Sequence, residues 1–217
     1  MVTLPRKAHQ AGFSLIEIAI VLVIIGLLLG GVMKGQTMVQ NTKIKRIATD
    51  TQAVQSAIHA YTDTYWQLPG DDNGATARFG LNATASQGDG DGVIVGAFDS
   101  AVASVETQLA WNHLRCASLI KGLCDLTASP ISDLPRNPVG GITGIAHGST
   151  TAELGLTTKM VCMQTVPSLY AEAYDILQDD GIGNTGDVRG SGNGEAAGAG
   201  TTVVYGANTT IYICSGF

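Results

Sequence analysis

Residues 13–33 read FSLIEIAIVLVIIGLLLGGVM, and Glu17 is the only charged side chain in this stretch. At about 1.5 Å of rise per residue, these 21 residues would span roughly 30 Å as a helix, which matches the hydrocarbon core of a bilayer. The sequence therefore predicts one membrane-spanning helix. Twelve residues that include Arg6 and Lys7 precede it. This start is similar to a secretory signal, but the apolar run is too long and no A-x-A cleavage pattern follows it.

The charges that flank the apolar segment do not orient it in a membrane. Two basic residues precede the segment and four follow it, namely Lys34, Lys43, Lys45 and Arg46. The more basic flank of a membrane helix is usually cytoplasmic. Charge alone would therefore not place the rest of the chain outside the cytoplasm.

Residues 12–17, GFSLIE, follow a short basic leader and open the apolar segment. This arrangement resembles the processing signal of type IV prepilins and pseudopilins. The resemblance implies that a membrane-embedded prepilin peptidase cleaves on the cytoplasmic side, between Gly12 and Phe13. It also implies that the peptidase methylates the new amino terminus at Phe13. The mature chain would then consist of the 205 residues that follow the leader.

The resemblance further implies a location and a set of partners. Before assembly, the subunit would be a single-pass protein of the inner membrane with its head in the periplasm. After assembly, it would be part of a pilus or another extracellular filament. The implied partners are prepilin peptidase, other pilin-like subunits, and further copies of the chain in a homo-oligomeric filament.

Glu17 needs an explanation, because a carboxylate inside a bilayer costs about 3 kcal/mol or more. One explanation is local: Glu17 lies four residues past Phe13, where headgroups and the dipole of a helix N-terminus favour an anion. The other follows from the resemblance, in which this glutamate pairs with the amino terminus of a neighbouring subunit. We favour this assembly role, because a misregistered subunit would leave a buried charge unpaired.

Residues 34–68 continue the helix as an amphipathic stalk. Steps of three and four residues connect a stripe formed by Ile44, Ile47, Thr51, Val54, Ile58, Tyr61 and Tyr65. This spacing predicts one helix from residue 13 to residue 66, with the stripe packed against a head. The glycines of the helix form two G-x-x-x-G spacings, at 26–30 and 31–35, which permit close helix packing or local unwinding.

Residues 69–217 form the predicted head, which turn-forming residues at 68–74 separate from the stalk. The residue patterns predict helices over 102–121 and 168–178 and strands over 159–166, 201–205 and 209–214, with a hairpin turn around Asn208. The expected fold class is α+β, a long N-terminal helix packed on a small antiparallel sheet with additional short helices. The domain order is therefore leader (1–12), membrane and polymerisation segment (13–33), stalk (34–68) and head (69–217).

The head is acidic, with 15 Asp or Glu residues against 6 Lys or Arg residues, whereas the whole chain has a net charge of −6. Proteins that bind a nucleic-acid backbone need clustered Lys or Arg. We therefore expect no direct nucleic-acid partner.

All four cysteines lie in the head, where a periplasmic location would favour disulfides. Four cysteines allow three pairings. We favour Cys116 with Cys124, which would close a short loop, and Cys162 with Cys214, which would tie two strands together.

Two acidic loops are candidates for calcium, a cation that prefers oxygen ligands. Asp89 and Asp91, near Asp71 and Asp72 in sequence, form the first, and Asp179 and Asp180 with Asp187 form the second. A resemblance to the major pseudopilins of type II secretion also implies calcium in a head loop. However, the EF-hand pattern is incomplete, and Asp and Gly are equally typical of turns. Calcium sites and ordinary turns both stay open, and no other cofactor is expected.

The sequence contains no motif typical of a catalytic site, and we expect no enzyme activity. Residues 181–186 match G-x-G-x-x-G, but a dinucleotide site needs a strand before this motif and a helix after it. Here a predicted helix precedes it. The leading hypothesis is a structural subunit of a type IV pilus-like filament. The alternatives are a pseudopilin of type II secretion and a non-polymerising, membrane-anchored periplasmic binding protein.

Overall fold

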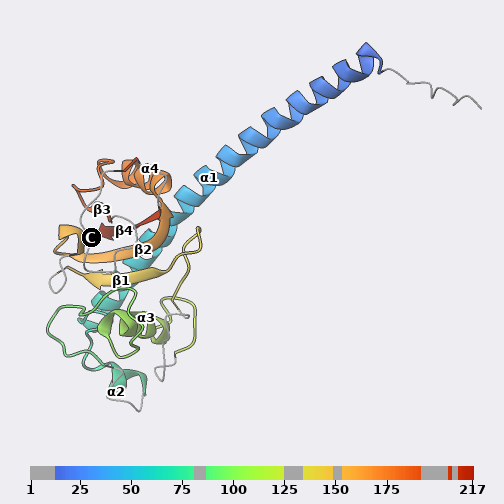
Figure 1. Cartoon of the computed structure of the whole chain (residues 1–217). Coiled ribbons are helices and arrows are strands. Elements are labelled where there is room, and N and C mark those ends of the chain that lie inside the picture. The colour runs from blue at the N-terminus through green and yellow to red at the C-terminus, as the bar shows by residue number, and fades with distance from the viewer. Residues whose placement is uncertain (1–12, 81–86, 125–133, 149–152, 192–204, 207–209) are drawn as a thin grey trace, which may run out of the picture. The chain divides into compact units, whose positions relative to one another are not determined.

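The computed structural model describes residues 13–80, 87–124, 134–148, 153–191, 205–206 and 210–217 (Figure 1). The chain divides into two compact units, Met1–Asn41 and Thr42–Phe217. The first helix, α1 (Leu15–Tyr65), contributes residues to both units and confirms the predicted helix over 13–66. It ends before Trp66, whose positive φ of 58° does not continue a right-handed helix.

Four antiparallel strands form the sheet of the second unit, in the order β1-β2-β4-β3. Their bounds are Thr143–His147 for β1, Lys159–Pro167 for β2, Val188–Ser191 for β3 and Thr210–Gly216 for β4. The register between β2 and β4 shifts between Met163 and Val166. Thr165 lies within this shift with a positive φ of 58°, as expected of a β-bulge.

Side chains alternate between the two faces of the sheet, as the pleat of a strand requires. On one face, Met163 packs with Ile47 of α1. On the other face, Cys162 packs with Phe98 and Leu154. Both faces are therefore covered, and only one of them is covered by α1.

The predicted stripe of α1 forms the centre of this core. Its five inner members are buried, and Ile44 and Tyr65 at its ends are half-buried. Ala48 and Ala57, which the stripe does not include, are buried as well. These alanines widen the buried face because other elements of the head also approach α1.

Two helices of eleven residues each complete the core around α1. From α3 (Glu106–Cys116), Trp111 and Leu114 pack in a cluster with Ile58. From α4 (Ser168–Gln178), Ala171 and Tyr174 pack in a second cluster with Ile47. The short helices α2 (Ala75–Phe79) and η3 (Glu153–Gly155) add to the head. The expected α+β fold class is confirmed.

The helix predicted over 102–121 is shorter in the structure. It begins at Glu106, because Val105 has extended backbone angles, and it ends at Cys116. Shortly after its end, Ser118 has a positive φ of 59°, which interrupts helical hydrogen bonding. The apolar residues on either side of α3 therefore belong to turns.

The sequence patterns identify two of the four strands. The strand predicted over 159–166 is β2, and the strand predicted over 209–214 is β4, which extends to Gly216. Strands β1 and β3, with the sequences TGIAH and VRGS, lack a strand pattern and are defined by their neighbours in the sheet. Tyr205 is not in a strand, and the rest of the strand predicted over 201–205, like Asn208, lies outside the described residues.

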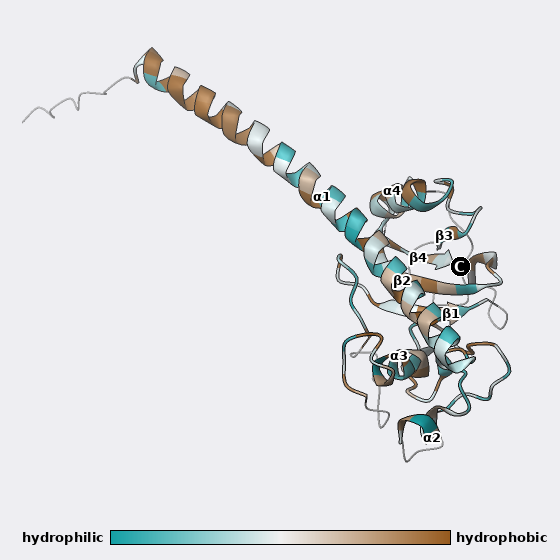
Figure 2. Ribbon diagram, turned by 180° about the vertical axis from the view of Figure 1, so that it is seen from behind, coloured by the Kyte–Doolittle hydropathy of each residue, from teal (hydrophilic) through white to brown (hydrophobic). Residues whose placement is uncertain are grey.

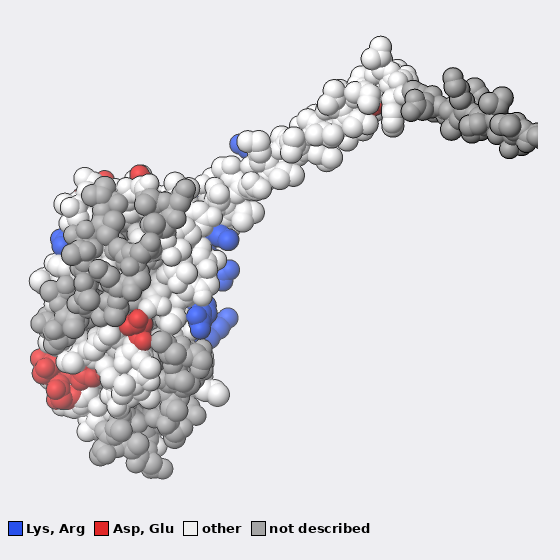
Figure 3. Space-filling view, in the orientation of Figure 1, with Lys and Arg blue, Asp and Glu red and all other residues white. Residues whose placement is uncertain are grey.

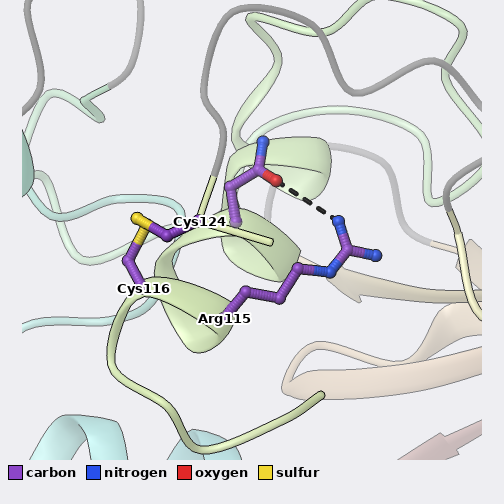
Figure 4. The surroundings of a disulfide bond; sticks show 4 residues. Arg115, Cys116 and Cys124 are labelled. Carbon is purple, nitrogen blue, oxygen red and sulfur yellow. Dashed lines mark hydrogen bonds between the residues drawn. A yellow bond between two sulfur atoms is a disulfide. The ribbon is translucent and has the colours of Figure 1, made fainter. Parts of the chain in front are cut away.

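The cysteines pair as predicted, Cys116 with Cys124 and Cys162 with Cys214. Cys162 and Cys214 stand opposite each other on β2 and β4, with their Cα atoms 4.0 Å apart, and both are fully buried. The Cys116–Cys124 bond closes the loop that follows α3, as Figure 4 shows. There, the Arg115 guanidinium donates a hydrogen bond of 3.3 Å to the side-chain oxygen of Asn112.

Candidate functional site

The segment predicted to be processed lies at the start of the described chain. Gly12 lies outside the described residues, and Phe13, on the other side of the predicted cleavage position, is 84% exposed. Phe13 and Ser14 precede the first residue of α1, Leu15. Phe13, the residue predicted to become the mature amino terminus, is therefore exposed and outside the helix.

Ser14 and Glu17 form a capping box at the start of α1. The Ser14 amide donates a hydrogen bond of 2.9 Å to the Glu17 carboxylate, and the Ile16 amide donates one of 3.4 Å to the Ser14 hydroxyl. These contacts satisfy amides that have no partner inside the first turn of a helix. The pattern S-x-x-E at residues 14–17 is the local sequence signal for this contact. Glu17 therefore has a local role in the single chain, and its assembly role stays a prediction.

The first unit exposes an extensive apolar surface. Between Leu15 and Val39, the large apolar side chains of α1 are exposed by 46% to 90%. Figure 2 shows this part of the helix as predominantly hydrophobic. The helix is long and apolar enough to cross a membrane, with a mean hydropathy of 2.8 in its most apolar window. Such a surface is stable only against lipid or against other apolar side chains.

The glycines of α1 leave open space on its surface. A Cβ atom added at Gly26, Gly30, Gly31 or Gly35 would meet no atom of the described chain within 4 Å, beyond the neighbouring backbone of the helix. The helix is continuous across all four positions, so local unwinding is not observed in the single chain. Close packing against another helix, which glycines at this spacing permit, stays a prediction.

The first acidic loop is built differently from the predicted pair. Asp89 lies with Asp71 and Glu106, and their carboxylate oxygens are all within 4.8 Å of one another. Asp91 does not belong to this group, and its carboxylate accepts a hydrogen bond of 2.8 Å from the Val93 amide.

Asp71 and Glu106 anchor the backbone of this loop. The Asp71 carboxylate accepts hydrogen bonds of 2.7 to 3.1 Å from three consecutive amides, at residues 90–92. The Glu106 carboxylate accepts hydrogen bonds from the amides of Asp89 and Val95. Burial raises the pKa of both Asp71 and Glu106 above the usual range. Through these hydrogen bonds, the two buried carboxylates hold the backbone of the loop in place.

The second acidic loop brings Asp179 and Asp180 together with Asp175 of α4, again with oxygens within 4.8 Å of one another. Asp187 contributes its amide, which donates a hydrogen bond to Asp179, and is not part of the group. Asp175 is fully buried, and burial raises its pKa. At Asp180, hydrogen bonds from the Thr185 hydroxyl and the Ile182 amide lower the pKa.

Both acidic groups have the donor chemistry that calcium requires. Calcium binds oxygen ligands at about 2.3–2.6 Å, so two ligands on opposite sides of the ion lie about 4.8 Å apart. The spacing within each group therefore allows the ion, and calcium binding stays a prediction. Isothermal titration of the full chain with calcium tests it, and titration without heat would contradict it. Glu106 is absent from the sequence-based candidates because only the fold brings it to the first loop, whereas Asp175, four residues before Asp179, was within reach of local spacing.

The comparison with known proteins concerns the N-terminal segment. Residues 7–33 match the family described as the prokaryotic N-terminal methylation motif. No curated protein and no solved structure matches the chain. The matched residues include the predicted cleavage position, the capping box and the exposed apolar residues of α1 up to Met33. The chain therefore carries the N-terminal methylation signature of type IV pilins and pseudopilins.

Proposed function

We propose that the chain is a non-catalytic, structural subunit of a type IV pilus-like filament. Prepilin peptidase cleaves it after Gly12 and methylates Phe13. The observation that carries this proposal is the apolar surface of α1 between Leu15 and Val39, which is exposed in the single chain and bears one carboxylate, Glu17. In a filament outside the membrane, bundling of such helices keeps their apolar surface out of water, and van der Waals packing between the helices holds them together.

In this proposal, the chain is located in the inner membrane before assembly. Residues 13–33 span the bilayer, and the second unit lies in the periplasm, where its two disulfides are stable. Cleavage creates an amino group at Phe13, which is largely protonated at neutral pH. In the filament, this cation pairs with Glu17 of a neighbouring subunit, so that the pairing sets the stagger between helices.

The test is to produce the full chain in cells with and without prepilin peptidase. Mass spectrometry of the subunit in sheared filaments is expected to show N-methylated Phe13 as the first residue. Electron microscopy is expected to show filaments only when the peptidase is present. An unprocessed chain that starts at Met1 and stays monomeric in a membrane that contains the peptidase would overturn the proposal.

A pseudopilin of type II secretion would share this processing and this helix packing. We prefer the pilus subunit because of the two disulfides and the size of the head. Recovery of the chain from sheared surface filaments supports the pilus, whereas recovery only from the cell envelope supports the secretion system.

A membrane-anchored binding protein receives less support. The described part of the head has a polar pocket of about 180 Å³ between α1, α4 and the C-terminal residues, lined among others by Gln52, Gln178 and Ser215. Sites for small molecules usually measure about 300–1,000 Å³. This pocket is small for such a site, and a pure membrane anchor does not require Glu17.

A further inference from the structure

Helix α4 has an apolar face on each side. Its inner face packs Ala171 and Tyr174 into the core with Ile47 of α1. Its outer face presents Leu169, Ile176 and Leu177, and Ile182 follows in the loop after the helix; these four side chains are 50% to 64% exposed. We call these four residues the outer face of α4. Exposed apolar surface of this kind on a folded domain typically marks an interaction site.

The border of this outer face is acidic. Between residues 168 and 188 there are five acidic residues and no Lys or Arg: Glu172, Asp175, Asp179, Asp180 and Asp187. Asp175 is buried beneath the helix, and the other four are exposed or half-buried. Glu172 lies between Leu169 and Ile176 at helical spacing, and so it belongs to the same side of α4.

A stretch of α1 has the complementary composition. Residues 34–46 contain three lysines and one arginine and no acidic residue. Figure 3 shows basic side chains gathered along this helix. Met38 is 64% exposed and Val39 is 57% exposed. Lys45 lies seven residues after Met38, and Arg46 lies seven residues after Val39, so each basic residue is on the same side of the helix as its apolar counterpart. Arg46 contacts Asp50 at 3.6 Å, but such an exposed pair is weak and leaves the stretch basic.

Within one chain, the inner face of α4 packs on Ile47, and the four side chains of the outer face stay 50% to 64% exposed, so a complementary stretch from another chain can still cover them. A second copy can provide it, because each chain carries both surfaces at different places. Contacts of this heterologous kind repeat from copy to copy and generate a helical filament when the rotation does not close. An anionic bilayer surface is a poorer partner, because it repels the acidic border.

We propose that the outer face of α4 docks on residues 34–46 of α1 of a neighbouring copy, with apolar contacts in the centre and acidic-to-basic contacts at the border. This contact rests on the proposed filament function and specifies how neighbouring subunits meet outside the bundle of membrane helices.

Cross-linking between two differently tagged copies of the full chain tests the contact. One copy carries Ile176→Cys and the other carries Val39→Cys, and a thiol-specific bismaleimide is added to assembled filaments. The native cysteines do not react, because both pairs are disulfide-bonded and no described cysteine is free. A heterodimer with both tags is expected. Val102→Cys in place of Ile176→Cys is the matched control, since Val102 is 56% exposed elsewhere on the head, and it should give no such heterodimer.

Charge reversal provides the second measurement. Glu172→Lys and Lys45→Glu are each expected to lower filament yield several-fold, and their combination is expected to restore it. Circular dichroism of each variant must match the native chain, so that misfolding is excluded. The contact would be overturned if both charge-reversal variants gave a normal filament yield and the cysteine variants formed filaments without a heterodimer. This result would leave the filament proposal intact.

The remaining outcomes separate the two proposals. If the native chain forms no filaments but the two cysteine variants still give a heterodimer, the contact is supported and the filament proposal is overturned. A fluorophore at Ile176→Cys that becomes shielded on vesicles of phosphatidylglycerol, without any heterodimer, would overturn the contact and identify a membrane surface as the partner.

Discussion

At the scale of single residues, this protein places carboxylates where charge is costly and gives each of them hydrogen-bond donors. Glu17 caps α1 through the Ser14 amide. Asp71 binds three consecutive backbone amides. Asp175 is fully buried below α4 and accepts a hydrogen bond from the Gly181 amide. The type of residue is visible in the sequence in each case, but its partners, and therefore its role, come from the local or tertiary geometry.

Two substitutions separate the capping role of Glu17 from its proposed role in assembly. A glutamine at this position still accepts the Ser14 hydrogen bond and completes a capping box, whereas a leucine does not. Because assembly requires the charge, Glu17→Gln and Glu17→Leu are both expected to be cleaved but to be absent from filaments. Immunoblots of membrane and filament fractions measure this. Normal incorporation of Glu17→Gln would show that only the cap matters, and Ser14→Ala is the control that weakens the cap alone.

Asp175 gives the stability of the head a specific pH dependence. Burial raises its pKa in the folded state, so the folded chain binds the proton more tightly than the unfolded chain. The stabilising contribution is therefore fully present below the unfolded pKa of about 3.9 and is lost as the pH rises through the raised folded pKa. Asp175→Asn removes this dependence. Its Tm is expected to rise relative to that of the native chain as the pH increases from about 4 to 7, and a pH-independent difference would contradict the raised pKa.

At the scale of elements, α1 is one continuous helix with two different apolar patterns. Its first part exposes its apolar residues, and its second part buries Ile47, Thr51, Val54, Ile58 and Tyr61. The difference in sequence is that the first part is apolar on all sides, whereas the second part restricts apolar residues to a stripe. The same helix therefore offers surface to lipid or other subunits in one part and packs on its own sheet in the other.

The same substitution at two places in α1 tests this division. Ile58 is fully buried, so Ile58→Ala is expected to lower the free energy of unfolding of the head by about 2–5 kcal/mol. Ile20 is 54% exposed, so Ile20→Ala is the matched control and should leave that free energy nearly unchanged. Denaturant unfolding in detergent, followed by tryptophan fluorescence, measures both. Equal destabilisation by the two variants would contradict the division.

The two disulfides are expected to differ in their contribution to stability. Loop-closure entropy is larger for Cys162–Cys214, with a sequence separation of 52, than for Cys116–Cys124, with a separation of 8. The estimated losses are about 4 kcal/mol and about 2.6 kcal/mol, respectively. Replacing each pair by serine and measuring denaturant unfolding tests this order. The burial of Cys162 and Cys214 strengthens the expectation, because serine hydroxyls would be buried there.

At the scale of the whole molecule, the two units differ: the described residues of Met1–Asn41 expose their apolar side chains, whereas those of Thr42–Phe217 form a core. All three apolar clusters lie within Thr42–Phe217. The second part of the stalk belongs to this unit, because its stripe is one wall of the core. The boundary of the folded unit therefore lies inside α1, upstream of the turn at 68–74 that ends the helix.

A fragment of residues 42–217 is therefore expected to fold alone, as a soluble domain with one cooperative thermal transition and both disulfides formed. The full chain is expected to require detergent, because it retains the exposed apolar part of α1. Calorimetry of the fragment and sedimentation of both proteins measure this. A fragment that begins at residue 69 is the control and should not fold, since it lacks the helix that covers one face of the sheet. Aggregation of the 42–217 fragment would contradict the assignment of its core.

The sequence by itself determined the membrane-length helix, the methylation signature, the stripe of the stalk and strand β2, because each depends on residues close together in the chain. It also suggested the disulfide pairs that the fold confirms. Only the tertiary structure decided that TGIAH and VRGS are strands, that Glu106 and Asp175 join the acidic loops, and that α4 keeps a second apolar face exposed. The strands and Glu106 depend on contacts between distant segments, which no local spacing encodes, whereas Asp175 lies only four residues before Asp179 and its place in the loop depends on where α4 ends.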